Sequence, residues 1–430
     1  MNTQNEKSLK HKKDKIDRFN RKYENPRKTL FNYLNGKLSF SYIGKKCLNG
    51  TISSDFRSTL YKILLNILPY NEPDSWKSNL EQTRKQYNLK LNKLLNRNEY
   101  IIPFINCEEK KGTETYENLL KLIPQEDCDL LALIKLDVDR TFQELDLFKN
   151  LKIKEMLCKI LYVFSKGIPE PSYCQGMNEI LGTLLYAFLP SLTLNDLTDF
   201  NFSMDKISED NVNLLYDYIT NEEFFEADLY TVYQEVMGRD LTTLYTYNCE
   251  RYRNKRFNFD YKTMSYEQVL NSEDTELGKR IKKIFYFDLK KIDSQFSNYL
   301  IENGLEPNIF LLRWLLCMLD RELNVNNTIW VWDCIFFYEF IEFTVKTVDI
   351  DKDRFNFLDH LCLSMMINLK KLIMESEDGG SMIMMHFLSF PNERNIREII
   401  TKATKISETL ENKNIWEDKI LQKNIVFNNK

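Results

Sequence analysis

Two short stretches of the chain carry charged and amide side chains that could do chemistry on another molecule. Asp137 and Arg140 lie three residues apart in LALIKLDVDRT (131–141), and Gln175 lies in PSYCQGMN (171–178). A guanidinium is planar and always charged, which matches negative charge spread over phosphoryl oxygens. A carboxamide can accept a hydrogen bond from water while donating one to an oxygen. These are properties of the residue types, and neither stretch by itself assigns such a role to Arg140 or Gln175.

The first stretch also has a purely structural interpretation. Leu130, Leu131, Ile134 and Val138 would share one face of a helix, which makes Asp137 and Arg140 neighbours at i and i+3. An ordinary surface ion pair of this kind contributes only tenths of a kcal/mol. Composition alone leaves both interpretations open.

The second stretch is readily explained as the start of a helix. Pro169 and Pro171 end the preceding helix, and Ser172 is a favourable N-cap with Gln175 at N3. These positions predict a capping box, in which the glutamine reaches back to the N-cap N–H. Taken alone, the stretch favours this structural role for Gln175.

The elements that must position these residues are predicted to be helices throughout. The chain of 430 residues has only 12 glycines and 10 prolines, which favours helices with short connections. Strand-like alternation is rare, whereas helical spacing of apolar residues recurs in the stretches 60–68, 153–164, 177–188, 311–323 and 358–373. Two stretches interrupt this pattern. Residues 190–212 are expected to form a loop or insertion, and residues 238–284 an extension packed outside the helical core.

Composition excludes several classes of function. The net charge is only −4, so bulk electrostatics does not predict nucleic-acid binding. Nine scattered cysteines without C-x-x-C spacing and three histidines predict no metal site, and indicate reduced core cysteines of a cytoplasmic protein. Neither GxxxxGK[ST] nor GxGxxG occurs, so the chain is not expected to hold a nucleotide cofactor of its own.

No membrane span is expected. The most apolar runs, 309–319 and 329–345, contain charged residues and are predicted to be core helices. Residues 1–28 hold ten Lys or Arg against four Asp or Glu, and no apolar leader. A solvated flexible tail is the favoured interpretation, and weak contact with an anionic endomembrane surface is the alternative.

The two stretches taken together resemble the paired signature motifs of the TBC domain of Rab GTPase-activating proteins. The first is Ile134-x-x-Asp137-x-x-Arg140-Thr141 and the second Tyr173-x-Gln175-Gly176-x-Asn178. Further matches follow in the family's order: Gly50 with Arg57, Glu226-x-Asp228, Phe310 to Arg313-Trp314, and Ile329 to Trp332-Asp333. The resemblance covers about residues 45–405 of a domain expected over 29–430, and DRFNFLD (353–359) is most similar to the member-thirteen branch.

The resemblance implies a V-shaped, all-α fold of two helical halves that acts on a Rab GTPase in its GTP form. Arg140 would be an arginine finger and Gln175 a glutamine finger, both supplied in trans, in the regulation of vesicle trafficking. Asp137, Tyr173 and Asn178 would support these two side chains. GTP and Mg²⁺ would be held by the GTPase. Scaffold roles are expected for the remaining motif residues: Ile134, Thr141, Gly176, Arg313, Trp332 and Asp333.

The chain departs from the family pattern at a few positions. Tyr61 stands where tryptophan is common, Phe142 opens a run without the frequent proline, and Thr231 replaces a frequent tryptophan. None of these removes a catalytic group, so they bear on packing and partner choice. The alternative function is a non-catalytic helical scaffold that binds Rab GTPases or other partners. A helical protein with chance motif matches is the third interpretation, and neither motif indicates which Rab is bound.

Overall fold

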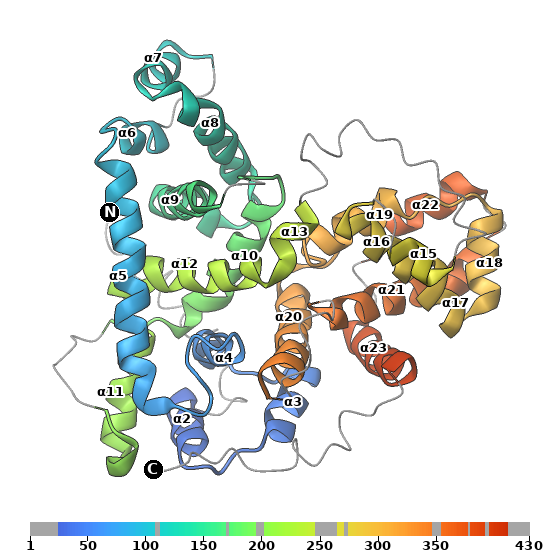
Figure 1. Cartoon of the computed structure of the whole chain (residues 1–430), viewed down its shortest axis with the longest axis horizontal. Coiled ribbons are helices and arrows are strands. Elements are labelled where there is room, and N and C mark those ends of the chain that lie inside the picture. The colour runs from blue at the N-terminus through green and yellow to red at the C-terminus, as the bar shows by residue number, and fades with distance from the viewer. Residues whose placement is uncertain are drawn as a thin grey trace, which may run out of the picture.

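The computed structural model describes residues 25–107, 112–168, 172–194, 202–245, 265–270, 274–345, 354–376, 379–391 and 395–411. These residues confirm the all-α prediction. An isolated bridge joins Thr193 and Asn221. Figure 1 shows two groups of helices, which diverge from a shared central region to give the predicted V-shaped arrangement of two halves.

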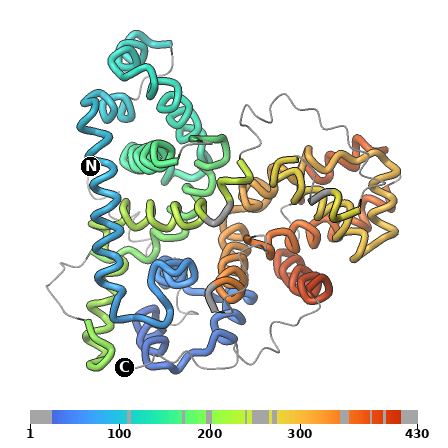
Figure 2. The backbone as a smooth tube through the Cα atoms, in the orientation of Figure 1, coloured from blue at the N-terminus to red at the C-terminus, as the bar shows by residue number. Residues whose placement is uncertain are grey.

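The first half contains the helices that carry the two signature motifs. Figure 2 shows this half as the blue-to-green part of the backbone. Its helices are α2 (Pro26–Leu34), α3 (Phe40–Leu48), α4 (Arg57–Leu64), α5 (Trp76–Leu95), α6 (Ile101–Ile105), α7 (Glu114–Leu122), α8 (Gln125–Arg140), α9 (Leu151–Gly167), α10 (Met177–Phe188), α11 (Glu209–Ile219) and α12 (Phe225–Val236).

The second half continues from the end of α12. It comprises α13 (Thr242–Leu244), α15 (Tyr266–Leu270), α16 (Glu276–Lys282), α17 (Leu289–Ile292), α18 (Ser294–Glu302), α19 (Asn308–Leu316), α20 (Val325–Glu339), α21 (Asn356–Glu375), α22 (Gly380–Leu388) and α23 (Ile396–Glu411). Helix α20 packs on α3, α4 and α10, and so joins the two halves. The predicted apolar stretches 153–164, 177–188 and 358–373 lie within α9, α10 and α21, whereas 60–68 and 311–323 extend beyond the ends of α4 at Leu64 and α19 at Leu316. The two most apolar runs form the core helices α19 and α20 with adjoining segments.

Motif residues far apart in sequence meet between α20 and the start of the first half. Gly50 adopts a left-handed backbone with φ of 63° and lies against the Trp330 ring, where an added Cβ would be 2.5 Å from a ring carbon. Arg57 donates from Nε to Asp333 Oδ1 at 2.9 Å, and the Tyr61 hydroxyl donates to the same oxygen at 2.9 Å. Asp333 is fully buried, so this network fixes α4 to α20.

Trp332 and Arg313 hold other parts of the scaffold. The Trp332 indole N–H donates to the Met318 carbonyl at 2.9 Å. Arg313 Nη2 donates at 2.8 Å both to Glu322 Oε2 and to the Leu388 carbonyl, which links α19 to the end of α22. Both side chains thus connect segments of the second half, and their scaffold roles stay predictions.

The buried carboxylate of Asp228 is surrounded by two cations. It accepts from Lys62 Nζ at 2.7 Å and from Arg84 Nε at 2.7 Å and Nη2 at 2.8 Å, and all three side chains are at most 4% exposed. Burial alone would raise the pKa of Asp228, but Lys62 and Arg84 hold it below its ordinary value. The cluster ties α4, α5 and α12 together.

Two sequence-based boundaries and the expected position of one segment need correction. The basic tail does not extend to residue 28, because α2 begins at Pro26 and Arg27 forms an ion pair with Asp217; residues 1–24 lie outside the described residues. The loop expected to end at 212 ends earlier, since α11 begins at Glu209.

The third correction concerns 238–284, which was expected to pack outside the core. Its described ends are part of the core instead: Leu241, Tyr245, Leu277 and Ile284 are at most 1% exposed. Residues 246–264 and 271–273 lie outside the described residues.

Two further expectations concern cysteines and membrane spans. The eight cysteines within the described ranges are all buried, in agreement with the core positions expected from the sequence. None of the described helices combines the length and the apolar character needed to cross a membrane.

Candidate functional site

The first signature motif ends α8 with an ion pair of unequal exposure. Asp137 accepts from Arg140 Nη2 one helical turn later; the aspartate side chain is 2% exposed and the arginine side chain 53% exposed. This differs from an ordinary surface pair, because the carboxylate is buried while the guanidinium is presented to solvent. The buried aspartate therefore restrains Arg140 without covering it.

The second motif is attached to the same aspartate. The Tyr173 hydroxyl lies 3.1 Å from Asp137 Oδ2, to which it donates, and 3.3 Å from Asn178 Oδ1. Asn178 Nδ2 donates to Thr141 Oγ1 at 2.9 Å, and the Thr141 hydroxyl donates to the Asp137 carbonyl at 2.9 Å. These bonds join the end of α8 to the turn before α10, so the structure brings the two motifs together.

Tyr173 remains a neutral donor under physiological conditions. Its burial, reinforced by the nearby Asp137 carboxylate, raises the pKa of Tyr173 well above the ordinary value. A neutral hydroxyl can donate to the carboxylate, whereas a phenolate would repel it. The tyrosine is therefore suited to hold Asp137, and through it Arg140, in one orientation.

Gln175 does not form the predicted capping box. Helix α10 begins at Met177 with Gly176 as its N-cap, so Ser172 and Gln175 both precede the helix. Gly176 has φ of 103°, a left-handed conformation that lets the chain turn just before the helix. Gln175 lies in this turn and is exposed. The structural role that the local sequence favoured is wrong, and the glutamine side chain is available to a partner.

The turn that carries Gln175 rests on residues from the second half. A Cβ at Gly176 would lie 3.1 Å from Cys317 Sγ and 3.4 Å from the Tyr245 hydroxyl. Tyr245 itself donates to the Leu316 carbonyl at 2.7 Å, and the Gly176 N–H donates to Asn178 Oδ1 at 3.2 Å. Sequence reasoning missed Tyr245 and Cys317, because neither belongs to a local motif and only the fold brings them under the turn.

Scaffold residues of the motifs pack α8 against α10. Ile134 is fully buried and Thr141 is 1% exposed. Gly182 lies against both Thr141 and Phe142, where an added Cβ would be 2.9 Å from each side chain. Small size at Gly182 lets the end of α8 approach α10 closely, which positions Arg140 relative to Gln175.

Charged residues beside the motifs were also missed from the sequence. Glu179 lies in the first turn of α10 and is partly buried. Burial raises the pKa of Glu179, whereas the charges of Arg321 and Arg140 oppose this rise. Arg321 is exposed, so the second half adds a cation within electrostatic reach of the site. No cluster of metal-binding side chains is found among the described residues.

An apolar strip leads along α8 to Arg140. Leu133 is 42% exposed and Leu136 is 48% exposed, and spacings of three and four residues place both on the helical face that ends at Arg140. Large exposed apolar side chains next to a restrained cation are typical of a surface that contacts another protein.

Comparison with known proteins identifies the family to which this arrangement belongs. The model of the Rab-GTPase-TBC domain family matches residues 54–257 and 262–352, which is more than half of the chain. The chain is a member of this family. The match runs through both signature motifs and through most of 238–284.

Relatives and a solved structure agree with this membership. The chain is 22% identical over 364 residues to human TBC1 domain family member 5, covering 84% of this chain and 42% of that protein. It is 23% identical over 355 residues to mouse TBC1 domain family member 13, covering 82% and 65% respectively. The crystal structure of the Ypt/Rab-GAP domain of Gyp1p superposes with a TM-score of 0.57 at 17% identity, covering 93% of this chain and 99% of that one.

The coverage and identity of these matches limit which properties of the relatives can be assigned to this chain. The member-thirteen proteins expected from the sequence are among the relatives, together with member 5 proteins. The chain spans only 17% to 42% of the length of the member 5 proteins that it matches first. The similarity to the Gyp1p domain shows a shared fold.

Proposed function

We propose that this protein accelerates GTP hydrolysis by a Rab-family GTPase, to which it supplies Arg140 and Gln175 in trans. The observation that carries the proposal is the hydrogen-bonded junction of the two motifs. Asp137 accepts from both Arg140 and Tyr173, while Gln175 follows Tyr173 by two residues and is exposed. Family membership supports a Rab as the partner.

Arg140 serves as the arginine finger. The transferred phosphoryl group develops negative charge on its equatorial oxygens, and a guanidinium fork can donate two parallel hydrogen bonds to them. Asp137 restrains the guanidinium from its buried side and leaves the outer N–H groups for the nucleotide. GTP and Mg²⁺ are held by the GTPase, so this chain needs no nucleotide site of its own.

Gln175 serves as the glutamine finger. Its amide oxygen accepts a hydrogen bond from the attacking water, and its amide nitrogen donates to a phosphoryl or backbone oxygen. The left-handed turn at Gly176 and the bond from the Gly176 N–H to Asn178 set the direction of the glutamine. Leu133 and Leu136 contact the surface of the GTPase beside the nucleotide and dock Arg140 over it.

The decisive experiment measures single-turnover GTP hydrolysis by a panel of GTP-loaded Rab GTPases. We expect wild type to accelerate at least one Rab, and Arg140→Ala to reduce that acceleration by about 10³- to 10⁵-fold, the usual contribution of an arginine finger. Gln175→Ala and Gln175→Glu should both lose most of the acceleration, because only the amide can both donate and accept.

Two matched control substitutions distinguish these effects from a non-specific loss of folding or activity. Arg97 is exposed after α5 and Gln125 is exposed at the start of α8, so Arg97→Ala and Gln125→Ala should keep wild-type activity. The proposal fails if no Rab is accelerated, or if folded Arg140→Ala and Gln175→Ala remain fully active. Tight binding of a GTP-loaded Rab without acceleration would instead support the non-catalytic scaffold.

A further inference from the structure

A hollow in the second half of the molecule lies between the end of α17, α21 and α23, away from the signature motifs. It is open to solvent and has about 290 Å³ of free space, the volume of roughly ten water molecules. Figure 1 shows α17 and α23 in the second half, whereas α8, which carries the first motif, belongs to the other half. We call this hollow the α17–α23 hollow.

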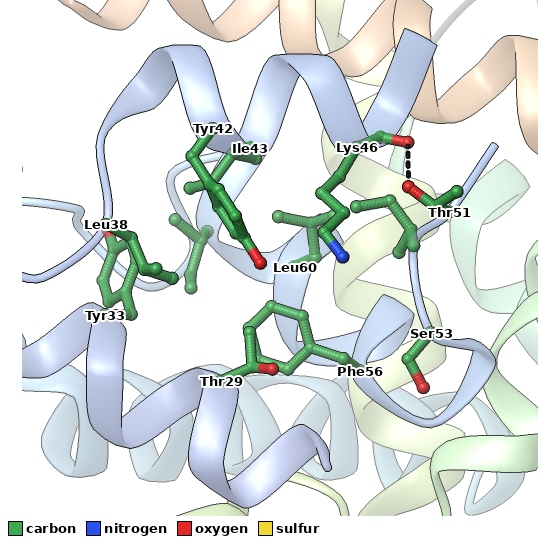
Figure 3. Close-up of a pocket in the computed structure, with 12 residues that line it drawn as sticks. Thr29, Tyr33, Leu38, Tyr42, Ile43, Lys46, Thr51, Ser53, Phe56 and Leu60 are labelled. Carbon is green, nitrogen blue, oxygen red and sulfur yellow. Dashed lines mark hydrogen bonds between the residues drawn. The ribbon is translucent and has the colours of Figure 1, made fainter. Parts of the chain in front are cut away.

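The α17–α23 hollow is much roomier than the one between α2, α3 and α4, which is also lined by a lysine. The hollow in the first half has only about 30 Å³ of free space, enough for one water molecule. Figure 3 shows that the side chains of Tyr42, Lys46 and Phe56 reach into the space between those helices. A ligand larger than water therefore fits the α17–α23 hollow but not the hollow in the first half.

Three lysines from two helices line the α17–α23 hollow. Lys291 lies near the end of α17, whereas Lys402 and Lys405 lie three residues apart on one face of α23. The side chain of Lys291 is 67% exposed and that of Lys402 is 32% exposed, and Lys405 is exposed as well. A ligand in the hollow can therefore reach all three side chains from solvent.

The contacts of these lysines leave their charges available. Lys291 Nζ lies 3.8 Å from Asp288 Oδ1, and Lys402 Nζ lies 3.9 Å from Glu398 Oε1. Both distances exceed that of a hydrogen bond, and such exposed pairs contribute little. No ion pair of the Lys405 ammonium group is found among the described residues. An anion that enters the hollow can therefore compete for all three ammonium groups.

The lining includes one acid, Asp293, whose charge is already compensated. It accepts from Lys370 Nζ at 2.6 Å and from the Phe296 N–H at 3.0 Å. Burial alone would raise the pKa of Asp293, but these two bonds hold it below its ordinary value. The described lining thus has three lysines against one paired carboxylate, in a chain whose net charge is −4. This local excess of positive charge favours an anionic ligand.

The type of donor in the hollow indicates how such a ligand is presented. The Thr409 hydroxyl is occupied by the Lys405 carbonyl at 2.8 Å, and Ile406 contributes a buried apolar surface. The hollow therefore offers lysine side chains, which are flexible and strongly hydrated cations suited to phosphate groups. One free phosphate is held weakly by such exposed donors. A membrane presents many phosphates at once, so weak contacts add up.

We propose that the α17–α23 hollow binds the phosphorylated headgroup of an inositol phospholipid at a membrane surface. The phosphorylated ring enters the hollow, and Lys291, Lys402 and Lys405 neutralise its phosphates. A phosphate monoester carries about −1.5 to −2 charges at pH 7, so it suits a cluster of three cations better than a singly charged headgroup does. The first half, which carries Arg140 and Gln175, takes no part in this contact. The site would hold the protein at a membrane by its second half.

The test is co-sedimentation of the full chain with phosphatidylcholine vesicles. The vesicles contain either phosphatidylinositol bisphosphate or phosphatidylserine at the same total charge. We expect the inositol lipid to bind at least about tenfold more tightly than phosphatidylserine, and added salt to weaken binding. Contact through the basic N-terminal residues would depend on total charge alone, so the matched vesicles distinguish it from binding in the hollow.

Lysine variants locate the site. Lys405→Glu should weaken binding to the inositol lipid vesicles by about tenfold or more, and Lys402→Gln by a few fold. Lys93→Glu, at an exposed lysine near the end of α5, should leave binding unchanged. Far-UV circular dichroism and thermal melting confirm that each variant is folded. Rab-stimulated GTP hydrolysis by Lys405→Glu in solution should equal that of wild type, so failure of this proposal is distinguishable from failure of the proposed function.

Three outcomes would overturn the proposal. The first is equal binding to the two kinds of charge-matched vesicle. The second is that folded Lys405→Glu binds the inositol lipid vesicles as tightly as wild type does. The third concerns inositol trisphosphate, the soluble headgroup, measured by isothermal titration calorimetry. Binding of this soluble headgroup as tight as binding of the vesicles would identify a dissolved phosphate ligand instead of a membrane.

Discussion

Two of the protein's arginine–aspartate pairs have the same chemistry but opposite exposure. Arg84 and Asp228 are each 4% exposed, and Lys62 completes their cluster in the core. Arg140 and Asp137 form a similar bond, but Arg140 is 53% exposed while Asp137 is 2% exposed. The first pair lies wholly inside the protein, where Arg84 Nε and Nη2 donate to Asp228 and only Arg84 Nη1 has no hydrogen-bond partner. The second buries only the carboxylate.

This difference separates a structural pair from one suited to act on a partner. A fully buried ion pair is out of reach of a ligand, and losing either member leaves an uncompensated charge. When only the carboxylate is buried, the guanidinium stays in contact with water, so its desolvation costs little. Its outer N–H groups can then donate to a ligand. Exposure of the cation, rather than presence of the pair, is what makes Arg140 the candidate for the proposed role.

The largest expected effect follows from truncating each arginine to methionine. Arg84→Met leaves Asp228 with Lys62 alone in a buried cluster, and we expect the free energy of unfolding to fall by about 3–5 kcal/mol. Arg140→Met should lower it by less than about 1 kcal/mol, since the guanidinium is half exposed. Urea denaturation followed by circular dichroism measures both. Equal losses for the two variants would contradict the distinction drawn between the pairs.

A smaller effect is expected from Tyr173→Phe, which removes the hydroxyl that holds Asp137. We expect the maximal single-turnover rate of Rab GTP hydrolysis to fall about tenfold, because Arg140 loses part of its restraint, while the half-saturating concentration stays unchanged. The stability loss should be about 1 kcal/mol.

Tyr87→Phe is the matched control for this substitution. The buried Tyr87 also donates to a carboxylate, Glu226 Oε1 at 2.7 Å, but it belongs to the α5–α12 contact. It should lose similar stability and keep the wild-type rate. A rate loss of the same size in both variants would show that the effect of Tyr173→Phe is general destabilisation.

The sequence predicted the helices and the two motifs well, because both are local patterns. Apolar spacing placed α9 and α21, and the i, i+3 relation of Asp137 and Arg140 was sufficient to predict their bond. The start of α10 was predicted wrongly for an equally local reason. Ser172 and Gln175 fit a capping box, but the left-handed turn at Gly176 delays the helix until Met177.

What the sequence could not provide is the set of contacts between distant segments. Tyr245 lies in a stretch without clear periodicity, yet it is fully buried beneath Gly176. Exposure is also a property of the fold: the residues around Arg84 and those around Arg140 carry no local signal that one guanidinium is covered and the other is not. The distinction between the two pairs therefore required the structure.

The smallest expected effect concerns a third kind of carboxylate, which forms no ion pair among the described residues. Asp320 Oδ1 accepts from the Thr183 hydroxyl at 2.6 Å, whereas its Oδ2 is buried without a hydrogen-bond partner. Burial raises the pKa of Asp320 well above the ordinary value. The folded protein thus binds this proton more tightly than the unfolded chain does. The resulting stabilisation is present below the unfolded pKa of about 4 and is lost as the pH rises through the folded pKa.

Asp320→Asn removes this pH dependence, because asparagine stays neutral. We expect the variant and wild type to have the same melting temperature near pH 5. At pH 8 the variant should melt a few degrees higher, because the buried Asp320 of wild type must either ionise in the core or hold a proton that the unfolded chain releases. Asp129→Asn, at an exposed position of α8, should show no such trend. A melting-temperature difference that is constant from pH 5 to pH 8 would mean that Asp320 does not titrate as its burial requires. A buried carboxylate without a cation would then behave like the paired Asp228, and pairing would not be what separates them.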